Sequence, residues 1–230
     1  MKSKLLQLLI LIATFLAPVR AEQTKGWPTI TVSSFISDKY LGFGTGNLLS
    51  TDPAVQSGIN LAFKNVVYVD LWTSRSLAGK WNDGSLGNEV DYQVGWKGSI
   101  ATNLTLHVGV TYFDEPQAFK FGAGDILYTQ VYLKREFKLL SVTAGLENFT
   151  TMPESVFQGG NLMSIGVSRY QPFCKGKMGV FASSALVYDT GTLGSGSGFI
   201  LRGNLSSEWK LTKHLTWNMV GMNWYVPLTA

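Results

Sequence analysis

Polar and apolar residues alternate one by one along several segments of this chain, and this alternation limits the possible folds more than any other feature. In the clearest segment, residues 89–99, the apolar positions are Val90, Tyr92, Val94 and Trp96, and the polar positions are Glu89, Asp91, Gln93, Lys97 and Ser99. Successive side chains of a β-strand point to opposite faces of its sheet. The pattern therefore predicts a strand with one apolar face and one polar face.

The same alternation recurs in segments 104–112, 140–147 and 199–209, and no segment sustains the spacing of an amphipathic helix. Eleven strands are predicted, at 28–42, 55–63, 66–75, 88–99, 104–113, 124–136, 139–149, 160–171, 177–188, 198–210 and 214–226. The segments near 178–188 and 214–226 alternate poorly, so no faces are assigned to them. Arg169 falls on the apolar side of its segment, which indicates either an interfacial position or a register that slips by one residue.

The connections between these segments alternate in length. Short turns are predicted at 64–65, 102–103, 137–138, 173–176 and 211–213, and longer loops at 44–54, 76–87, 114–123, 150–159 and 189–197. Tight turns at one rim and long loops at the other are typical of a transmembrane β-barrel, whose short turns are periplasmic. The sequence therefore predicts an all-β fold: an antiparallel transmembrane β-barrel with eleven visible strands and about 12 expected.

Alternation alone is also compatible with a soluble exported barrel, which places its apolar side chains inside. Three features favour lipid outside the apolar face. The chain begins like an exported protein, aromatic residues make up 13% of it with several near the predicted strand ends, and charged residues fall mostly on one face of the strands whose faces can be assigned. The apolar face is therefore expected to contact the membrane.

The first residues are typical of a signal peptide. Two lysines precede an apolar run at residues 5–16, and small residues flank Arg20, so cleavage is expected after Ala21. The run is shorter than the roughly 20 residues of a membrane-spanning helix, which disfavours an uncleaved anchor. A single outer-membrane barrel domain is then expected at residues 22–230.

Composition argues against several other classes of protein. Residues 1–21 hold three of the 19 basic residues and none of the 15 acidic ones, so the exported chain would carry 16 basic and 15 acidic residues. The basic residues are scattered, which argues against nucleic-acid binding. One cysteine, Cys174, and two histidines leave no recognisable zinc site. The glycine-rich runs at 42–46 and 191–198 lack the context of a phosphate-binding loop, so no metal and no cofactor is predicted.

Four segments in the first half of the chain resemble a known family. Phe35–Tyr40, Pro53–Asn60, Val69–Ser74 and Glu89–Trp96 follow the order of motifs in a group of small proteobacterial outer-membrane proteins labelled TorF-related. The match covers about residues 33–99 and is architectural beyond them. The sequence departs from the family at residues 41–44, where Leu-Gly-Phe-Gly replaces the usual Arg-Gly. The resemblance implies an outer-membrane barrel, with a pore as the expected form, and brings no catalytic residues.

Ten polar-face residues are the candidate lining of the barrel lumen: Asp70, Glu89, Asp91, Gln93, Lys97, His107, Lys134, Glu147, Arg202 and Glu208. Charges inside a barrel must pair or be hydrated, because an unpaired charge in a dry interior costs several kcal/mol. A hydrated channel whose charges set selectivity and a salt-bridged plug that braces the wall both satisfy this condition. Tyr68, Trp72, Tyr128 and Tyr132 share the same parity and would narrow the lumen.

The expected function is passive diffusion of small hydrophilic solutes through a small pore, without enzymatic activity. The alternatives are a closed-lumen structural or surface-interaction barrel and, more remotely, an outer-membrane hydrolase that uses His107 with a nearby serine. The expected partners are outer-membrane lipid, the solutes of an open pore, and the barrel-assembly machinery during biogenesis. An odd strand count would end segment 214–226 on the outer side, so either a twelfth strand is missing at the C-terminus or the strands between Phe35 and Ala54 are miscounted.

Overall fold

The fold is taken from a computed structural model of the chain, which describes residues 28–38, 40–41, 48–50, 52–64, 66–77, 89–114, 125–151, 158–192, 196–212 and 215–228. The signal peptide predicted at residues 1–21 lies outside the described residues, as do parts of the predicted long loops.

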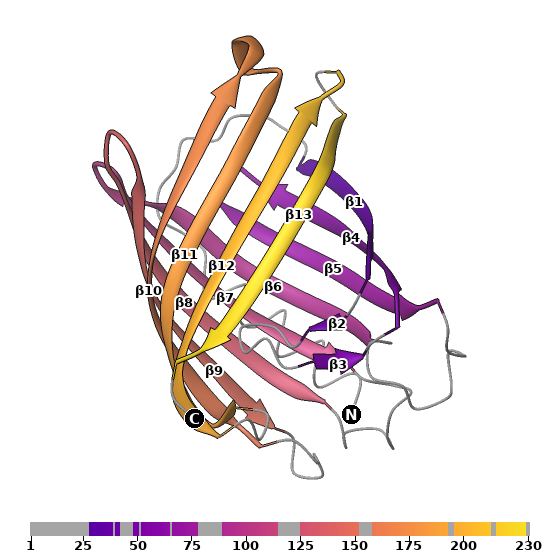
Figure 1. Cartoon of the computed structure of the whole chain (residues 1–230), viewed down its shortest axis with the longest axis vertical. Coiled ribbons are helices and arrows are strands. Elements are labelled where there is room, and N and C mark those ends of the chain that lie inside the picture. Colours follow the sequence, from indigo (N-terminus) through magenta and orange to yellow (C-terminus); the bar gives the residue numbers. More distant parts are fainter. Residues whose placement is uncertain are drawn as a thin grey trace.

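Eleven strands form one antiparallel sheet in which each strand pairs with the next along the chain (Figure 1). Their bounds are β1 Thr29–Ser37, β4 Ala54–Phe63, β5 Val67–Ser76, β6 Glu89–Ala101, β7 Leu104–Asp114, β8 Ile126–Glu136, β9 Ser141–Thr151, β10 Gly160–Phe173, β11 Met178–Thr190, β12 Ser197–Lys210 and β13 Thr216–Pro227. The predicted all-β, antiparallel fold class is confirmed, and each of these strands overlaps one of the eleven predicted segments.

The first predicted segment, 28–42, is too long. β1 ends at Ser37, and the chain then forms β2 (Tyr40–Leu41) and β3 (Leu48–Ser50), which pair only with each other in a separate two-stranded sheet. The pairing of β2 with β3 is irregular, with a register shift between Tyr40 and Leu41. These two short strands belong to the connection between β1 and β4, so they add no strand to the main sheet.

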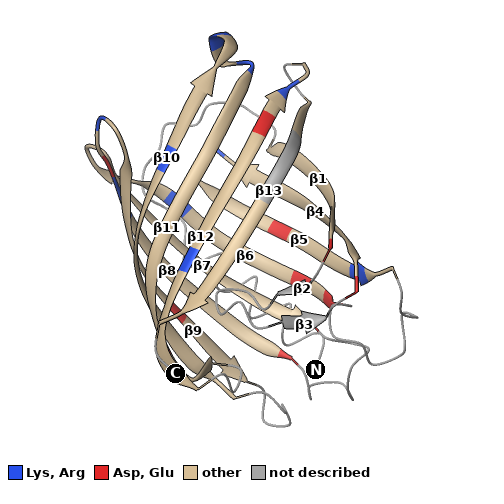
Figure 2. Ribbon diagram, viewed as in Figure 1, with Lys and Arg blue, Asp and Glu red and all other residues tan. Residues whose placement is uncertain are grey.

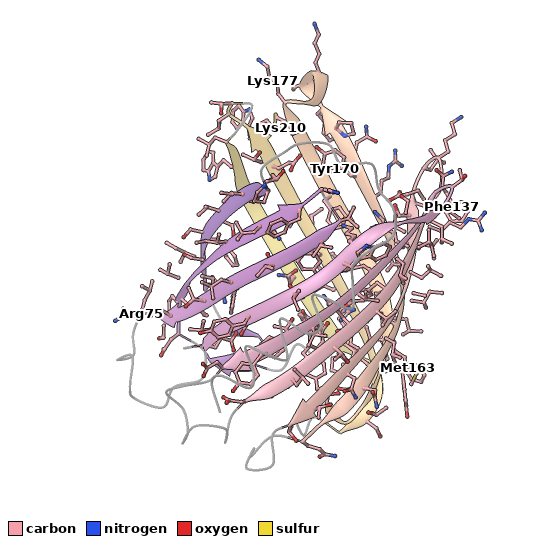
Figure 3. The ribbon with its side chains drawn as sticks, turned by 180° about the vertical axis from the view of Figure 1, so that it is seen from behind. Arg75, Phe137, Met163, Tyr170, Lys177 and Lys210 are labelled. Carbon is pink, nitrogen blue, oxygen red and sulfur yellow. The ribbon has the colours of Figure 1, made fainter. Side chains whose placement is uncertain are left out.

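Connections of two kinds alternate at the two ends of the sheet. Residues 64–66, 102–103, 137–140, 174–177 and 211–215 join strands at one end, and longer connections lie at the other end. The turn after β10 contains a 3-10 helix, η1 (Cys174–Gly176), in which Lys175 adopts positive φ. Lys177 and Lys210 mark this short-turn end in Figure 3. Among the described residues, no helix is long and apolar enough to cross a membrane.

The outer face of the sheet is apolar. Met163 and Ile165 of β10 are 46% and 59% exposed on this face, and Figure 3 shows Met163 pointing away from the concave side. In the described strands, the charged residues of outward parity are Arg75, Asp114, Arg135 and Arg169, all within a few residues of a strand end. The other charged residues of the described strands have inward parity, and Figure 2 marks where the charged residues lie along the ribbon.

Arg169 keeps its outward position because the pairing of β10 with β11 runs without a register shift from Leu162 to Phe173. The predicted alternative of a slipped register at Arg169 is therefore wrong. The residue lies near the short turn, where its guanidinium donates a hydrogen bond of 2.8 Å to Gln171.

The sheet coils around a concave interior. β1 and β13 are its two edges, and they are not paired with each other in the described part of the chain. Thr31 of β1 and Tyr225 of β13 nevertheless line the same internal cavity. Five buried apolar residues of β8–β11 form one cluster on the concave side: Ile126, Tyr128, Phe149, Leu162 and Val187.

Candidate functional site

The concave side of the sheet is lined by every second residue of each strand. One row of cross-strand partners runs through Asn60, Asp70, Gln93, Thr111 and Tyr128 on five neighbouring strands. Because paired residues lie directly opposite each other, their side chains share a face of the sheet. The alternation seen in the sequence thus brings polar groups from many strands into one interior.

A buried ion pair crosses this interior. Glu147 of β9 is fully buried, and Arg202 of β12 donates a hydrogen bond of 2.9 Å from Nη2 to its Oε1 atom. Tyr128 donates from its hydroxyl to Oε2 of the same carboxylate at 3.1 Å. β10 and β11 lie between β9 and β12 in the sheet, so the pair bridges strands that are not neighbours. Such pairing offsets the cost of burying a carboxylate.

Three more side chains extend this arrangement across the wall. The hydroxyls of Tyr128 and Tyr132 lie 3.3 Å apart. The Tyr132 ring stacks on His107 with ring centroids 5.8 Å apart, and His107 Nε2 is 2.5 Å from the Tyr68 hydroxyl. We call these six residues the interior network: Tyr68, His107, Tyr128, Tyr132, Glu147 and Arg202. It connects β5, β7, β8, β9 and β12.

Glycines let two of these tyrosines lie flat against the wall. A Cβ atom on Gly145 would come within 2.5 Å of the Tyr132 ring, and one on Gly95 would collide with the ring of Tyr68. Each glycine is the cross-strand partner of the tyrosine that covers it. The absence of a side chain at these positions therefore makes room for a ring close to the backbone.

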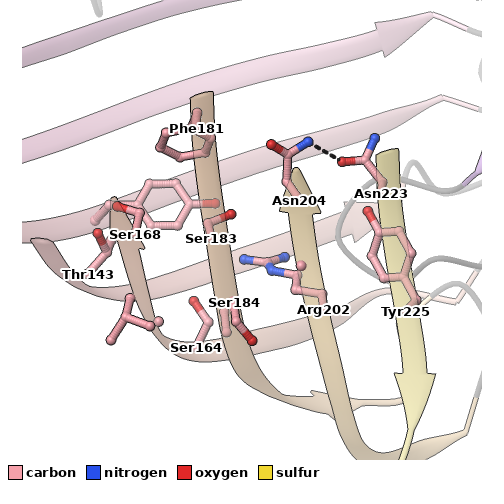
Figure 4. A pocket seen from close by; sticks show the side chains of 15 residues that line it. Thr143, Ser164, Ser168, Phe181, Ser183, Ser184, Arg202, Asn204, Asn223 and Tyr225 are labelled. Carbon is pink, nitrogen blue, oxygen red and sulfur yellow. Dashed lines mark hydrogen bonds between the residues drawn. The ribbon is translucent and has the colours of Figure 1, made fainter. Parts of the chain in front are cut away.

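Two cavities lie in the interior. The larger, of about 640 Å³, is lined by residues of β1, β4–β8 and β13, and the smaller, of about 340 Å³, by residues of β8–β13. Figure 4 shows the smaller one, with Ser164, Ser168 and Ser183 facing it beside Arg202. Asn223 and Tyr225 line both cavities, and Asn223 accepts a hydrogen bond of 2.8 Å from Asn204.

All ten predicted lining residues have inward parity, and the structure divides them into three groups. Four line the larger cavity: Asp70, Glu89, Asp91 and Gln93. Three belong to the interior network: His107, Glu147 and Arg202. Three lie toward the short turns: Lys97, Lys134 and Glu208.

Their partners differ accordingly. Asp70 accepts a hydrogen bond of 2.6 Å from Asn60. Lys134 forms an exposed ion pair of 2.5 Å with Glu136, and Glu208 accepts a hydrogen bond from Tyr170. Only the network group therefore joins strands from opposite sides of the smaller cavity.

Sequence reasoning missed Asn223 and Tyr225, which line both cavities. Their strand pairs with β12 through a register shift at Ser207 and Glu208, so the alternation along β13 is interrupted. An extra residue in one strand reverses which side chains face inward, and this hides the pattern in the sequence. No other feature of the sequence indicated that Tyr225 would line the interior.

Two observations bear on the remaining chemical roles considered for the interior. A hydrolase would need a serine beside His107 Nε2, where the structure has the Tyr68 hydroxyl. In the described ranges, no group of three or more His, Cys, Asp or Glu residues could hold a metal ion.

A family model described as a bacterial protein of unknown function (Gcw_chp) matches residues 26–153. These residues include β1 to β9 and therefore Glu147, whereas Arg202 lies beyond the match. Neither the curated proteins nor the solved structures compared with the chain include a match.

Proposed function

The chain belongs to the Gcw_chp family of bacterial proteins of unknown function, and we propose that it is an outer-membrane β-barrel through which small hydrophilic solutes diffuse. The finer resemblance to TorF-related outer-membrane proteins, carried by the motifs at residues 33–99, agrees with this assignment. Its partners would be the outer-membrane lipids, the permeating solutes, and the machinery that inserts barrels during biogenesis.

The single observation that carries the proposal is the contrast between the two faces of the sheet. On the outer face of the described strands, charged residues lie only near strand ends, and the middle of β10 exposes Met163, Ile165 and Val167. On the inner face, carboxylates, hydroxyls and two cavities occur together. The apolar outer face can contact lipid, and the polar inner face can be hydrated, as in an outer-membrane pore.

A second candidate is a barrel with a closed lumen, in which the interior network only braces the wall. The complete burial of Glu147 and its pairing with Arg202 favour this alternative. Both candidates share the membrane location and differ in whether water and ions pass through the interior.

Two measurements test the proposal. The full-length chain, expressed in a Gram-negative host, should fractionate with the outer membrane and migrate differently on a gel before and after heating. The purified protein should then produce stepwise ionic currents in a planar lipid bilayer. Recovery in the soluble periplasmic fraction would overturn the membrane assignment, whereas a folded membrane protein without current would leave the closed barrel.

A further inference from the structure

We infer that the Glu147–Arg202 ion pair is the constriction of the lumen and sets which ions pass it. This inference rests on the proposed pore. Its first support is position: Arg202 reaches Glu147 across two intervening strands. In the row that pairs with Arg202, those strands carry Ala185 and Gly166, whose small size leaves the concave surface clear for the long arginine side chain.

The second support is the arrangement of the two cavities around the pair. Arg202 and Tyr132 line the smaller cavity, whereas Tyr128 lines the larger one. Glu147 contacts both Tyr128 and Arg202, so its carboxylate lies between the two groups of lining residues. In this arrangement, a solute that moves from one cavity to the other passes beside Tyr225, which borders both cavities, and beside the ion pair.

The third support is the charge on either side of the pair. Among the described residues that line the larger cavity, Asp70, Glu89 and Asp91 are acidic and none is basic. Arg202 is the one charged residue among the described lining of the smaller cavity. The larger cavity therefore favours cations, and Arg202 supplies the positive charge that opposes them where the passage narrows.

This arrangement makes a sign-specific prediction that a purely structural brace does not make. Glu147→Gln keeps the shape of the side chain but leaves Arg202 as the net charge of the constriction, so the cation-to-anion permeability ratio should fall several-fold. Arg202→Gln leaves Glu147 beside the acidic cavity, so the same ratio should rise several-fold. The double variant Glu147→Gln/Arg202→Gln removes both charges without leaving an unpaired one, and its conductance should rise.

The experiment is a set of planar-bilayer recordings in a KCl gradient, from variants whose folding is first checked by heat-modified gel migration. Glu136→Gln is the matched control, because it removes one charge from an exposed ion pair toward the short turns. The control should keep the wild-type ratio to within the scatter of the recordings. The double variant keeps the test decisive if a single variant does not fold.

The outcomes separate this inference from the proposed pore. Wild-type current reports on the pore, and the ratio of variant to wild type reports on the constriction. Opposite shifts in the two single variants support the inference. Current that appears only in the double variant would show that the wild-type lumen is closed, and it would overturn both the pore and the selectivity assigned to the pair. Wild-type current with the same selectivity and conductance in all folded variants overturns the inference and leaves the pore. No current from any folded variant overturns both.

Discussion

The two halves of the sheet are built differently on the inside. In β1 and β4–β9, the interior carries large rings and carboxylates, such as Tyr68, Trp72 and Asp91. In β10–β13, small residues such as Ser164, Gly166 and Ser183 line much of the interior, beside the larger Arg202 and Tyr225. The outer faces of the two halves are alike, with Val131 and Ile165 exposed at 45% and 59%. The two halves therefore share one kind of outer face and differ in the lining of the concave side.

Glu147 and Arg202 join these two halves, so breaking their pair should have the largest effect on stability. Arg202→Leu would leave the fully buried Glu147 without its cation, at a cost of about 3–5 kcal/mol in the free energy of unfolding. Glu147→Leu should cost less, because the Arg202 side chain keeps 21% of its surface exposed and can be hydrated. Urea unfolding of the refolded protein in lipid bilayers measures both values. Equal costs for the two substitutions would contradict this expectation, because they would show that an unpaired Arg202 is as costly as an unpaired Glu147.

A charge placed on the outer face tests whether lipid surrounds both halves. Val131→Arg in β8 and Ile165→Arg in β10 lie near the middle of their strands, and each should destabilise the protein by roughly 2–4 kcal/mol. Ser168→Arg is the matched control, because Ser168 faces the smaller cavity, where an added guanidinium can be hydrated. The same bilayer unfolding assay applies. A large cost at Val131 with none at Ile165 would show that the outer faces of the two halves do not have the same surroundings.

Glycines offer a finer comparison of how tightly the two halves are packed. At Gly166 in β10, a Cβ would lie 2.8 Å from the Cβ of Ala185 and 2.9 Å from the backbone oxygen of Ser184. Because backbone atoms cannot move aside, Gly166→Ala should cost about 1–3 kcal/mol. At Gly145 in β9, the obstacles are the Tyr132 ring and the Ser164 hydroxyl, which can rotate away.

Gly145→Ala should therefore cost less stability than Gly166→Ala while changing the surroundings of Tyr132. Unfolding experiments give the two stabilities, and near-ultraviolet circular dichroism reports on the tyrosine. A larger loss of stability at Gly145 would contradict the packing described for Tyr132.

Strand faces could be predicted from the sequence where the two faces differ in polarity. Residues 89–99 alternate between apolar and polar side chains, and β6 keeps that register up to Trp96 against β5 and up to Ser99 against β7. β11 gave no such signal, because small residues such as Ala182, Ser183 and Ser184 occupy both of its faces. Hydropathy carries no face information when both faces are small and weakly polar.

The interior network could be predicted only in part. Parity alone placed Glu147 and Arg202 on the same face, and the need to neutralise buried charge indicated that they would pair with something. Their pairing with each other depends on how the sheet coils, because they lie on strands separated by two others. Sequence spacing fixes neighbours along and across adjacent strands, and it does not fix contacts over the concave side.

The smallest effect is expected at the exposed ion pair of Lys134 and Glu136, which serves as the counterpart of the buried pair. The two side chains are 38% and 46% exposed, so water already solvates both charges. Glu136→Gln should therefore change the free energy of unfolding by no more than about 1 kcal/mol, and this difference should shrink as salt screens the pair. Unfolding at low and high KCl measures it. A loss of unfolding free energy as large as that expected for Arg202→Leu would show that the exposed pair stabilises the protein as much as the buried pair. Exposure would then not explain the difference expected between the rim and the interior.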